Sequence, residues 1–314
     1  MDTPAPPAGF RLRGASGMGH RELWHALRVA ISAAAKDTVM AQTTDQAAAE
    51  AIVAPAASTD GSAVVVPLGS EPRYGVTDID PTEAAESERT TPSLTLEQVK
   101  ADREVQSLIR QANRNLGVLG FTEHGFRHVG LCASIARNVL RILGYDERQQ
   151  ELAAIAAYLH DIGNVVSRHN HSVSGALLAH EILHRLGMDF DDIAVVIGAI
   201  GSHDGDSNHL GESVHPVSAA LILADKSDVH RSRVRNNDPA SFDQHDRVNY
   251  SATSSFLRVD PEAKTITLEL TIDTTMAPVM QYFEIFLPRM LMCRHAAALL
   301  GCEFHIRMNE VELL

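Results

Sequence analysis

The chain has 314 residues and a formal net charge of −13 at pH 7, from 40 acidic and 27 basic side chains. This acidic balance argues against non-specific binding to nucleic acid or to an anionic membrane, although it leaves room for a local basic pocket that holds a phosphate. No apolar run approaches the roughly 18 residues that span a bilayer, no signal peptide is apparent, and the three cysteines form no C-x-x-C pair, so the sequence predicts a cytoplasmic protein without a membrane partner.

Residues 1–92 differ in composition from the rest of the chain. Pro, Ala, Ser, Thr and Asp dominate there. Such a segment buries too little apolar surface to offset the conformational entropy lost on folding. The sequence therefore predicts a low-complexity, disordered N-terminal region, with order beginning near Ser93.

A helical domain is predicted over residues 93–250. Thr95 and Gln98 form a capping box that starts the first helix, which should run to about Leu116. Apolar residues at helical spacing then predict five further helices. These cover Phe126–Leu143, Asp146–His160, Ser172–Leu186, Asp191–Ser202 and Pro216–Val234.

Residues 251–314 change character. Ser255–Val259 and Thr265–Ile272 alternate between apolar and polar residues as strands do, Ala277–Leu300 is helical in pattern, and Cys302–Met308 alternates again. We expect a mainly α fold, a helical bundle with a small C-terminal α+β appendage and a flexible N-terminal region.

Two metal motifs overlap between residues 157 and 187. The first is the zinc-peptidase pattern H-E-x-x-H, which runs from His180 to His184. Two histidines four apart share one face of a helix and can bind one ion. On this helix, however, Gly175, Leu178 and Ile182 form the apolar stripe, and the two histidines lie nearly opposite it. The zinc peptidase therefore remains the weaker alternative.

The second motif is the couplet His160-Asp161 at the end of an apolar helix. Other ligand-type residues stand at helix ends or on inner faces. A carboxylate beside a histidine can bridge two ions that share a hydroxide, which is a nucleophile near neutral pH. Mixed histidine and aspartate ligands suit Mn, Fe, Zn or Mg. The candidate ligands are His128, His160, Asp161, His171, His203 and Asp225.

The series His128, His160-Asp161 and Asp225 resembles the HD-domain metal-dependent phosphohydrolases, in which a lone histidine, a His-Asp pair and a distal aspartate follow in this order. The flanking segments LAAIAAYLHDIGN and LILADKSDVHR are similar to the family's ligand helices, and the resemblance covers about Leu94–Arg235. It implies that these four residues hold one divalent ion.

The closest pattern within that superfamily is that of the HD-GYP proteins. HSVSGALL at His171 and GSHDGD at His203 are similar to their segments, which implies a second ion held by these histidines with Asp161 bridging. The GYP triplet itself is absent, and Asn164 stands where the family has a lysine.

Phosphate chemistry also needs cations that neutralise the substrate oxygens. Lys226 adjoins a proposed ligand and is the first candidate, with Asp161, for a catalytic role. The candidate substrate-binding residues are Arg168, Lys226, Arg231 and Arg233. The polar segment Asp243–Tyr250 could complete the substrate pocket or cap the appendage.

These patterns predict a metal-dependent phosphohydrolase or phosphodiesterase that uses one or two divalent ions and cleaves an ester or anhydride of a nucleotide or similar small phosphate. No basic groove for nucleic acid is apparent. The alternative is a non-catalytic nucleotide-binding sensor, whose appendage transmits the signal. In either case the appendage could form a homodimer.

Overall fold

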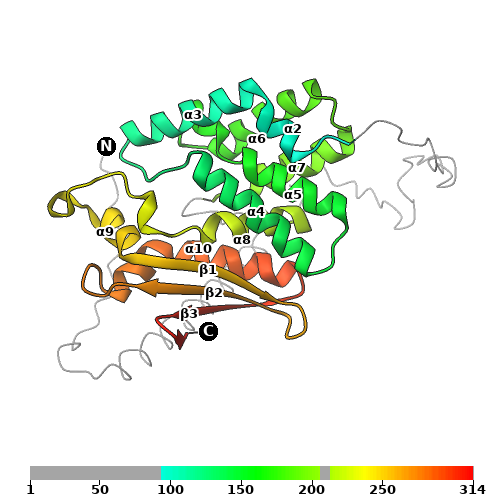
Figure 1. Cartoon of the computed structure of the whole chain (residues 1–314). Coiled ribbons are helices and arrows are strands. Elements are labelled where there is room, and N and C mark those ends of the chain that lie inside the picture. The colour runs from blue at the N-terminus through cyan, green and yellow to red at the C-terminus, as the bar shows by residue number, and fades with distance from the viewer. Residues whose placement is uncertain (1–92, 206–212, 314) are drawn as a thin grey trace, which may run out of the picture. The chain divides into compact units, whose positions relative to one another are not determined.

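A computed structural model of the protein describes residues 93–205 and 213–313, so the predicted N-terminal region 1–92 lies outside the described residues. Figure 1 shows helices that stand above a small sheet formed by the C-terminal part of the chain. The prediction of a mainly α fold with a C-terminal α+β appendage is confirmed.

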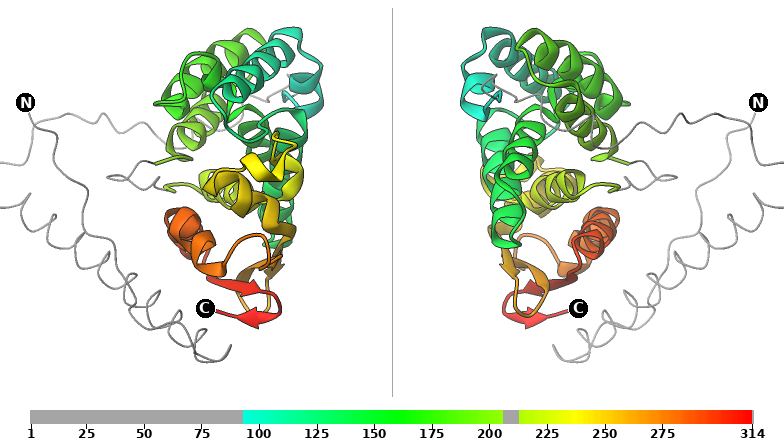
Figure 2. Two further views of the ribbon diagram at one scale, coloured as in Figure 1. Left: turned by 90° about the vertical axis from the view of Figure 1, so that its left-hand side faces the viewer. Right: turned by 90° about the vertical axis from the view of Figure 1, so that its right-hand side faces the viewer.

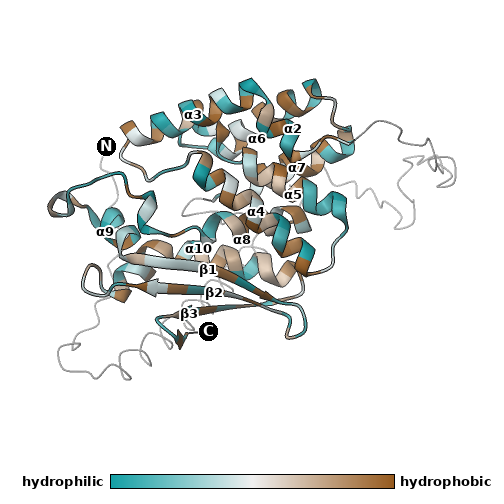
Figure 3. Ribbon diagram, in the orientation of Figure 1, coloured by the Kyte–Doolittle hydropathy of each residue, from teal (hydrophilic) through white to brown (hydrophobic). Residues whose placement is uncertain are grey.

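The first predicted helix is divided in two at Asp102. α2 (Leu96–Ala101) begins with the predicted capping box, in which the Gln98 N–H donates to the Thr95 side chain. Asp102 then ends α2 and begins α3 (Arg103–Val118), because its carboxylate accepts from the backbone N–H groups of Glu104 and Val105. A short polar side chain that binds the backbone in this way competes with a continuous helix. Teal and brown bands alternate along α3 in Figure 3, as on a helix with one buried face.

The centre of the bundle is built from α5 and α8. Every residue from Leu152 to Leu159 in α5 and from Val217 to Ser227 in α8 is buried. Helices that are covered on all sides are apolar all round rather than along one stripe. α4 and α7 both pack against this central pair. The helices are α4 (Phe126–Ile142), α5 (Glu147–Leu159), α6 (His171–Arg185), α7 (Phe190–Ser202) and α8 (Pro216–Ser227).

The predicted helix Pro216–Val234 is too long, because α8 ends at Ser227. Asp228 leaves the helical region with φ −80° and ψ 77°. Its side chain accepts from Arg127 and contacts His128, and its carbonyl accepts from the Arg233 guanidinium. These tertiary contacts turn the chain into the short 3-10 helix η2 (Arg231–Arg233).

The appendage is a four-stranded sheet covered by one helix. The strand order is β1-β2-β3-β4, with β1 and β2 antiparallel and β2 and β3 parallel across α10. α10 packs against β2 and β3 and also against α8, which joins the appendage to the bundle (Figure 2). The elements are β1 (Ala252–Asp260), β2 (Thr265–Ile272), α10 (Val279–Leu299), β3 (Glu303–Met308) and β4 (Val311–Glu312).

The polar segment Asp243–Tyr250 forms most of a short helix, α9 (Gln244–Ser251), which is capped by Asp243. It packs against η2, β1 and α10. None of the helices in the described part of the chain is both long and apolar enough to cross a membrane.

Candidate metal centre

The structure brings all six predicted ligands together at one place, where the ends of five helices meet. His128 lies in the first turn of α4, His171 opens α6, and Asp225 lies in the last turn of α8. His160 is the C-cap of α5 and His203 is the C-cap of α7. Asp161 directly follows His160. All six residues are buried. Side chains at helix ends can therefore converge from different directions on one small volume.

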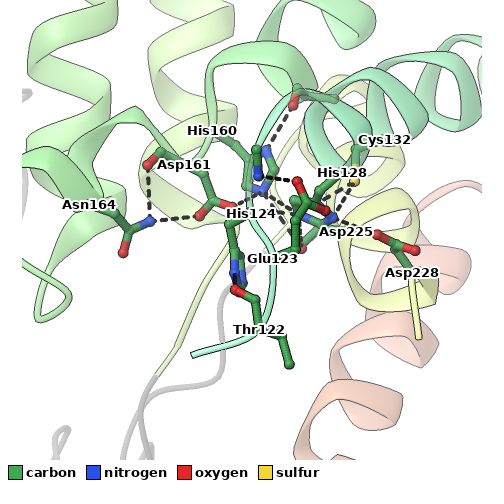
Figure 4. Close-up of polar contacts among 12 residues, drawn as sticks. Thr122, Glu123, His124, His128, Cys132, His160, Asp161, Asn164, Asp225 and Asp228 are labelled. Carbon is green, nitrogen blue, oxygen red and sulfur yellow. Dashed lines mark hydrogen bonds and ion pairs between the residues drawn. The ribbon is translucent and has the colours of Figure 1, made fainter. Parts of the chain in front are cut away.

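Four of the six form a first group around His160. The Nε2 atoms of His128 and His160 lie 3.3 Å apart. Asp225 Oδ1 lies 3.3 Å from His128 Nε2 and 3.6 Å from His160 Nε2. Asp161 Oδ2 lies 3.1 Å from His160 Nε2 and 3.5 Å from His128 Nε2. Figure 4 shows these side chains pointing toward one another.

A second group shares Asp161. His171 Nε2 lies 3.2 Å from His203 Nε2 and 3.5 Å from Asp161 Oδ1. Asp161 thus turns Oδ2 toward the first group and Oδ1 toward the second. The second trio offers its ligand atoms within 4.8 Å of one another. Asp161 therefore presents one carboxylate oxygen to each group of potential ligands.

Each of the four imidazoles has its Nδ1 atom against an acceptor oxygen. The acceptors are Asp228 Oδ2 for His128 (2.7 Å), Ala157 O for His160 (2.8 Å), Arg168 O for His171 (3.2 Å) and Ile200 O for His203 (2.6 Å). Because a carbonyl or a carboxylate can only accept, we infer that Nδ1 carries the proton, which leaves Nε2 with its lone pair in the neutral ring. Metal-binding histidines in proteins are held in this way.

The donor set fits divalent cations. In each group two Nε2 lone pairs face each other, which is unfavourable unless a cation or a proton lies between them. Asp161 Oδ2 is buried and accepts no hydrogen bond within the described part of the chain. His160 Nε2 lies 3.1 Å from this oxygen, and a proton or a cation at that place offsets the cost of burying the carboxylate. Imidazole and carboxylate ligands together suit Zn, Mn or Fe.

In the first group, a bound ion would compete with a proton on His160. Burial alone raises the pKa of the Asp161 and Asp225 carboxyls, but His160 beside Asp161 and Lys226 beside Asp225 hold both well below their usual range. Burial also lowers the pKa of His160, yet the two carboxylates outweigh it and raise that pKa to about 10. An ion bound here would displace a proton. In the second group, by contrast, burial lowers the pKa of His203 to about 3.

Two residues next to the couplet fix Asp161 in place. Asn164 Nδ2 donates to the Asp161 backbone oxygen at 3.0 Å and to Oδ1 at 2.9 Å. A side chain on Gly163 would overlap the His171 carbonyl oxygen and lie 2.5 Å from the Gly175 nitrogen. The close approach of the couplet to α6 therefore requires glycine at position 163.

The four predicted substrate-binding cations separate into two pairs. The Lys226 ammonium lies 2.8 Å from Asp225 Oδ2, and Arg168 lies 3.3 Å from His171 Nε2, so both adjoin the cluster. Arg233 instead donates to backbone oxygens of Glu123 and Asp228, which braces η2. The Arg231 guanidinium lies over the Tyr250 ring, 5.1 Å from its centroid. The roles of all four in substrate binding stay predictions.

Several residues that lie close to the predicted ligands were not predicted from the sequence motifs. Asp204, directly after His203, accepts from Lys226 Nζ at 2.9 Å. The His124 ring lies 5.3 Å from the His128 ring, centroid to centroid. Arg289 of α10 interacts electrostatically with Asp225, Asp204 and Arg168, and burial lowers its pKa. Its position on a helix of the appendage gave no sequence signal of a contact with the bundle.

The zinc-peptidase motif stands apart from this centre. The Glu181 side chain is 83% exposed and the His180 side chain 41%. The His180 and His184 rings are stacked with centroids 6.2 Å apart. Neither residue belongs to any cluster of three potential ligands among the described residues. The geometry thus favours the couplet over H-E-x-x-H.

Comparison with known proteins concerns the part of the chain that contains these residues. Residues 125–230 match the family model of the HD domain, which confirms the resemblance seen in the sequence. An uncharacterized protein of Methanocaldococcus jannaschii is 25% identical over 166 residues, which are 46% of this chain and 62% of the relative. The match therefore spans less than two thirds of that relative.

Proposed function

We propose that the protein is a metal-dependent phosphohydrolase that cleaves an ester or anhydride of a small phosphate, with a nucleotide as the preferred class. The match of residues 125–230 to the HD-domain family model supports the proposal. The observation that carries the proposal is the position of Asp161. Its two carboxylate oxygens face two separate histidine pairs, at 3.1 Å from His160 and 3.5 Å from His171.

With two ions bound, the charge of the cluster would favour an anionic substrate. Asp161 and Asp225 together offset one divalent ion, and Lys226 offsets Asp204. One bound ion would leave the cluster about neutral, whereas two would leave a net positive charge that attracts a phosphate. Divalent ions at such a site lower the pKa of water and offset the charge that develops on the phosphate oxygens.

The chain's own side chains would hold and orient the substrate. Arg168 is the best placed of them, because its guanidinium adjoins His171 and its side chain is still 26% exposed. Arg289 of α10 would add a second guanidinium from the appendage. The net charge of −13 disfavours long polyanions, which supports a small phosphate rather than nucleic acid.

Elemental analysis and a substrate screen test the proposal together. Protein purified without chelators should contain two transition-metal ions per chain in the wild type, none with Asp161→Ala, and one with His203→Ala. His180→Ala is the matched control, a histidine outside the centre, and should keep both ions. A panel of nucleoside mono-, di- and triphosphates and cyclic nucleotides, followed by chromatography, should show turnover that Asp161→Ala abolishes.

Two outcomes would reject the proposal. One zinc ion that survives Asp161→Ala and is lost with His180→Ala would favour the peptidase. Nucleotide binding that changes the oligomeric state without any turnover, measured by light scattering on the full chain, would favour the sensor. We also propose that the chain forms a homodimer through the appendage, where β1 is one of the two edge strands of the sheet.

A further inference from the structure

His128 is held between two carboxylates of one helix. Its Nε2 atom, on the side of the metal centre, lies 3.3 Å from Asp225 Oδ1, and its Nδ1 atom lies 2.7 Å from Asp228 Oδ2. The two aspartates are three residues apart, one on the last turn of α8 and the other just beyond it. The end of α8 therefore contacts both nitrogens of the same imidazole.

Asp228 is itself held by two arginines. Arg127, the residue before His128, donates to both Asp228 carboxylate oxygens at 3.1 and 2.8 Å. The Arg233 Nε atom lies 3.6 Å from Asp228 Oδ2, and the same guanidinium donates to the Asp228 carbonyl at 2.7 Å. The Asp228 side chain is only 2% exposed. A carboxylate buried and fixed to this degree has a defined orientation, so the imidazole that donates to it has one too.

We propose that Asp228 is a positioning residue for the metal centre: it holds His128 as the Nδ1–H tautomer, turns Nε2 toward the ion, and is in turn aligned by Arg127. The carboxylate also makes the imidazole a stronger ligand, because it offsets the positive charge that the ring gains on binding a cation. The inference rests on the metal site proposed above and is independent of which phosphate is the substrate.

Arg127 and Asp228 lie on the side of His128 that faces away from the other predicted ligands. Arg127 and Asp228 line a cavity of about 500 Å³ whose lining contains none of the six ligands. Its walls come from α4, β1 and η2. Substitutions of Arg127 or Asp228 therefore change the support of His128 without replacing any of the six ligand residues.

The test compares metal affinity with stability. Asp228→Ala should weaken the ion bound by His128 roughly 10- to 100-fold, the usual effect of losing such an outer partner. Asp228→Asn should have a smaller effect, because its amide oxygen can still accept from Nδ1. Arg127→Met removes the hydrogen bonds to Asp228 and one to Glu123 but keeps the Asp228 carboxylate, so its effect should fall between those of Asp228→Asn and the wild type. Affinity is measured by competition with a chromophoric chelator, using Zn²⁺ and Mn²⁺ on the full chain.

Asp192 provides the matched control. It accepts two hydrogen bonds from Arg148, at 3.0 and 2.8 Å, in a similar partly buried pair between helices. Asp192→Asn and Asp192→Ala should lower the melting temperature of the metal-free protein as the Asp228 variants do, with metal affinity unchanged.

Three results would overturn the inference. If Asp228→Ala folds and binds metal within twofold of the wild type, Asp228 has only a structural role. If Asp228→Ala does not fold, equal metal affinity of Asp228→Asn, Arg127→Met and the wild type leads to the same conclusion. If the wild-type chain binds neither ion, the metal centre and this inference fail together, which separates that case from the other two.

Discussion

The ammonium of Lys226 lies 2.8 Å from Asp225 Oδ2, with the two side chains 5% and 12% exposed. Lys226 Nζ also donates to Asp204 at 2.9 Å. Because its ammonium is paired with two carboxylates, Lys226 has little freedom to contact the phosphate of a bound substrate. Its main effect is to compensate two carboxylates at the centre of the fold.

We expect Lys226→Gln to cost stability first. Removing one partner of a buried ion pair leaves the other charge uncompensated, at a cost of about 3–5 kcal/mol. The free energy of unfolding, measured with denaturant on the metal-free protein, should fall by on the order of 3 kcal/mol, whereas KM for an identified phosphate substrate should change little. A rise in KM at unchanged stability would instead restore the predicted role of Lys226 in orienting the phosphate.

The difference between what the sequence predicted and what it missed follows from distance along the chain. Helical periodicity placed His171 on the inner face of α6, and the end of an apolar helix placed His160, because both follow from local geometry. Nothing local says that Asp228 meets Arg127 and His128 from about a hundred positions away. That contact depends on how α4 packs against α8.

The end of α8 shows the same limit. Its apolar and basic residues continue a helical pattern to Val234, and pattern alone extends the helix. The actual end at Ser227 is set by tertiary partners of Asp228, which no periodicity reveals.

Gly163→Ala should separate the two halves of the centre. The added methyl group would overlap the His171 carbonyl oxygen, so η1 (Ile162–Val165) and the start of α6 must move apart. Overpacking of this kind costs typically 1–3 kcal/mol. We expect lower stability in thermal unfolding and loss of the ion between Asp161 and His171, with the ion at His128 retained.

Gly130→Ala is the control for that variant. Gly130 lies inside α4, and a side chain there meets nothing within 4 Å. Alanine should stabilise the helix by up to about 1 kcal/mol and leave the metal content unchanged. If Gly163→Ala behaves like Gly130→Ala, the close approach of the couplet to α6 is wrong.

The three cysteines should be unreactive in the folded protein. Cys132, Cys293 and Cys302 are all buried free thiols. Burial raises the pKa of Cys293 to about 12 and that of Cys132 well above its usual value. Because the thiolate is the reactive form, a chromogenic disulfide reagent at pH 8 should titrate none of them in the native state and all three in guanidinium.

The same shift gives a pH dependence of stability. The unfolded chain releases the Cys293 proton near pH 8.5, whereas the folded chain keeps it to about pH 12. Above about pH 8.5 the unfolded state therefore binds fewer protons, and the free energy of unfolding should fall as pH rises toward 12. Cys293→Ala should reduce this slope. Equal slopes for the variant and the wild type would show that Cys293 is not buried as described.

Arg168 and Arg289 should act on substrate binding rather than on metal binding. Arg168 approaches His171, and its guanidinium lies over the Phe121 ring, 5.4 Å from the centroid. Loss of a charge-assisted hydrogen bond to a phosphate costs about 1.5–3 kcal/mol, so Arg168→Gln should raise KM by roughly ten-fold or more. Metal content should stay at the wild-type value, because the substitution changes none of the six predicted metal ligands. Arg289→Gln should give a similar rise, since the Arg289 guanidinium of α10 interacts electrostatically with Asp225 and Asp204 at the same cluster. If both variants lose metal at unchanged KM, the two arginines support the ligands and the phosphate is bound elsewhere.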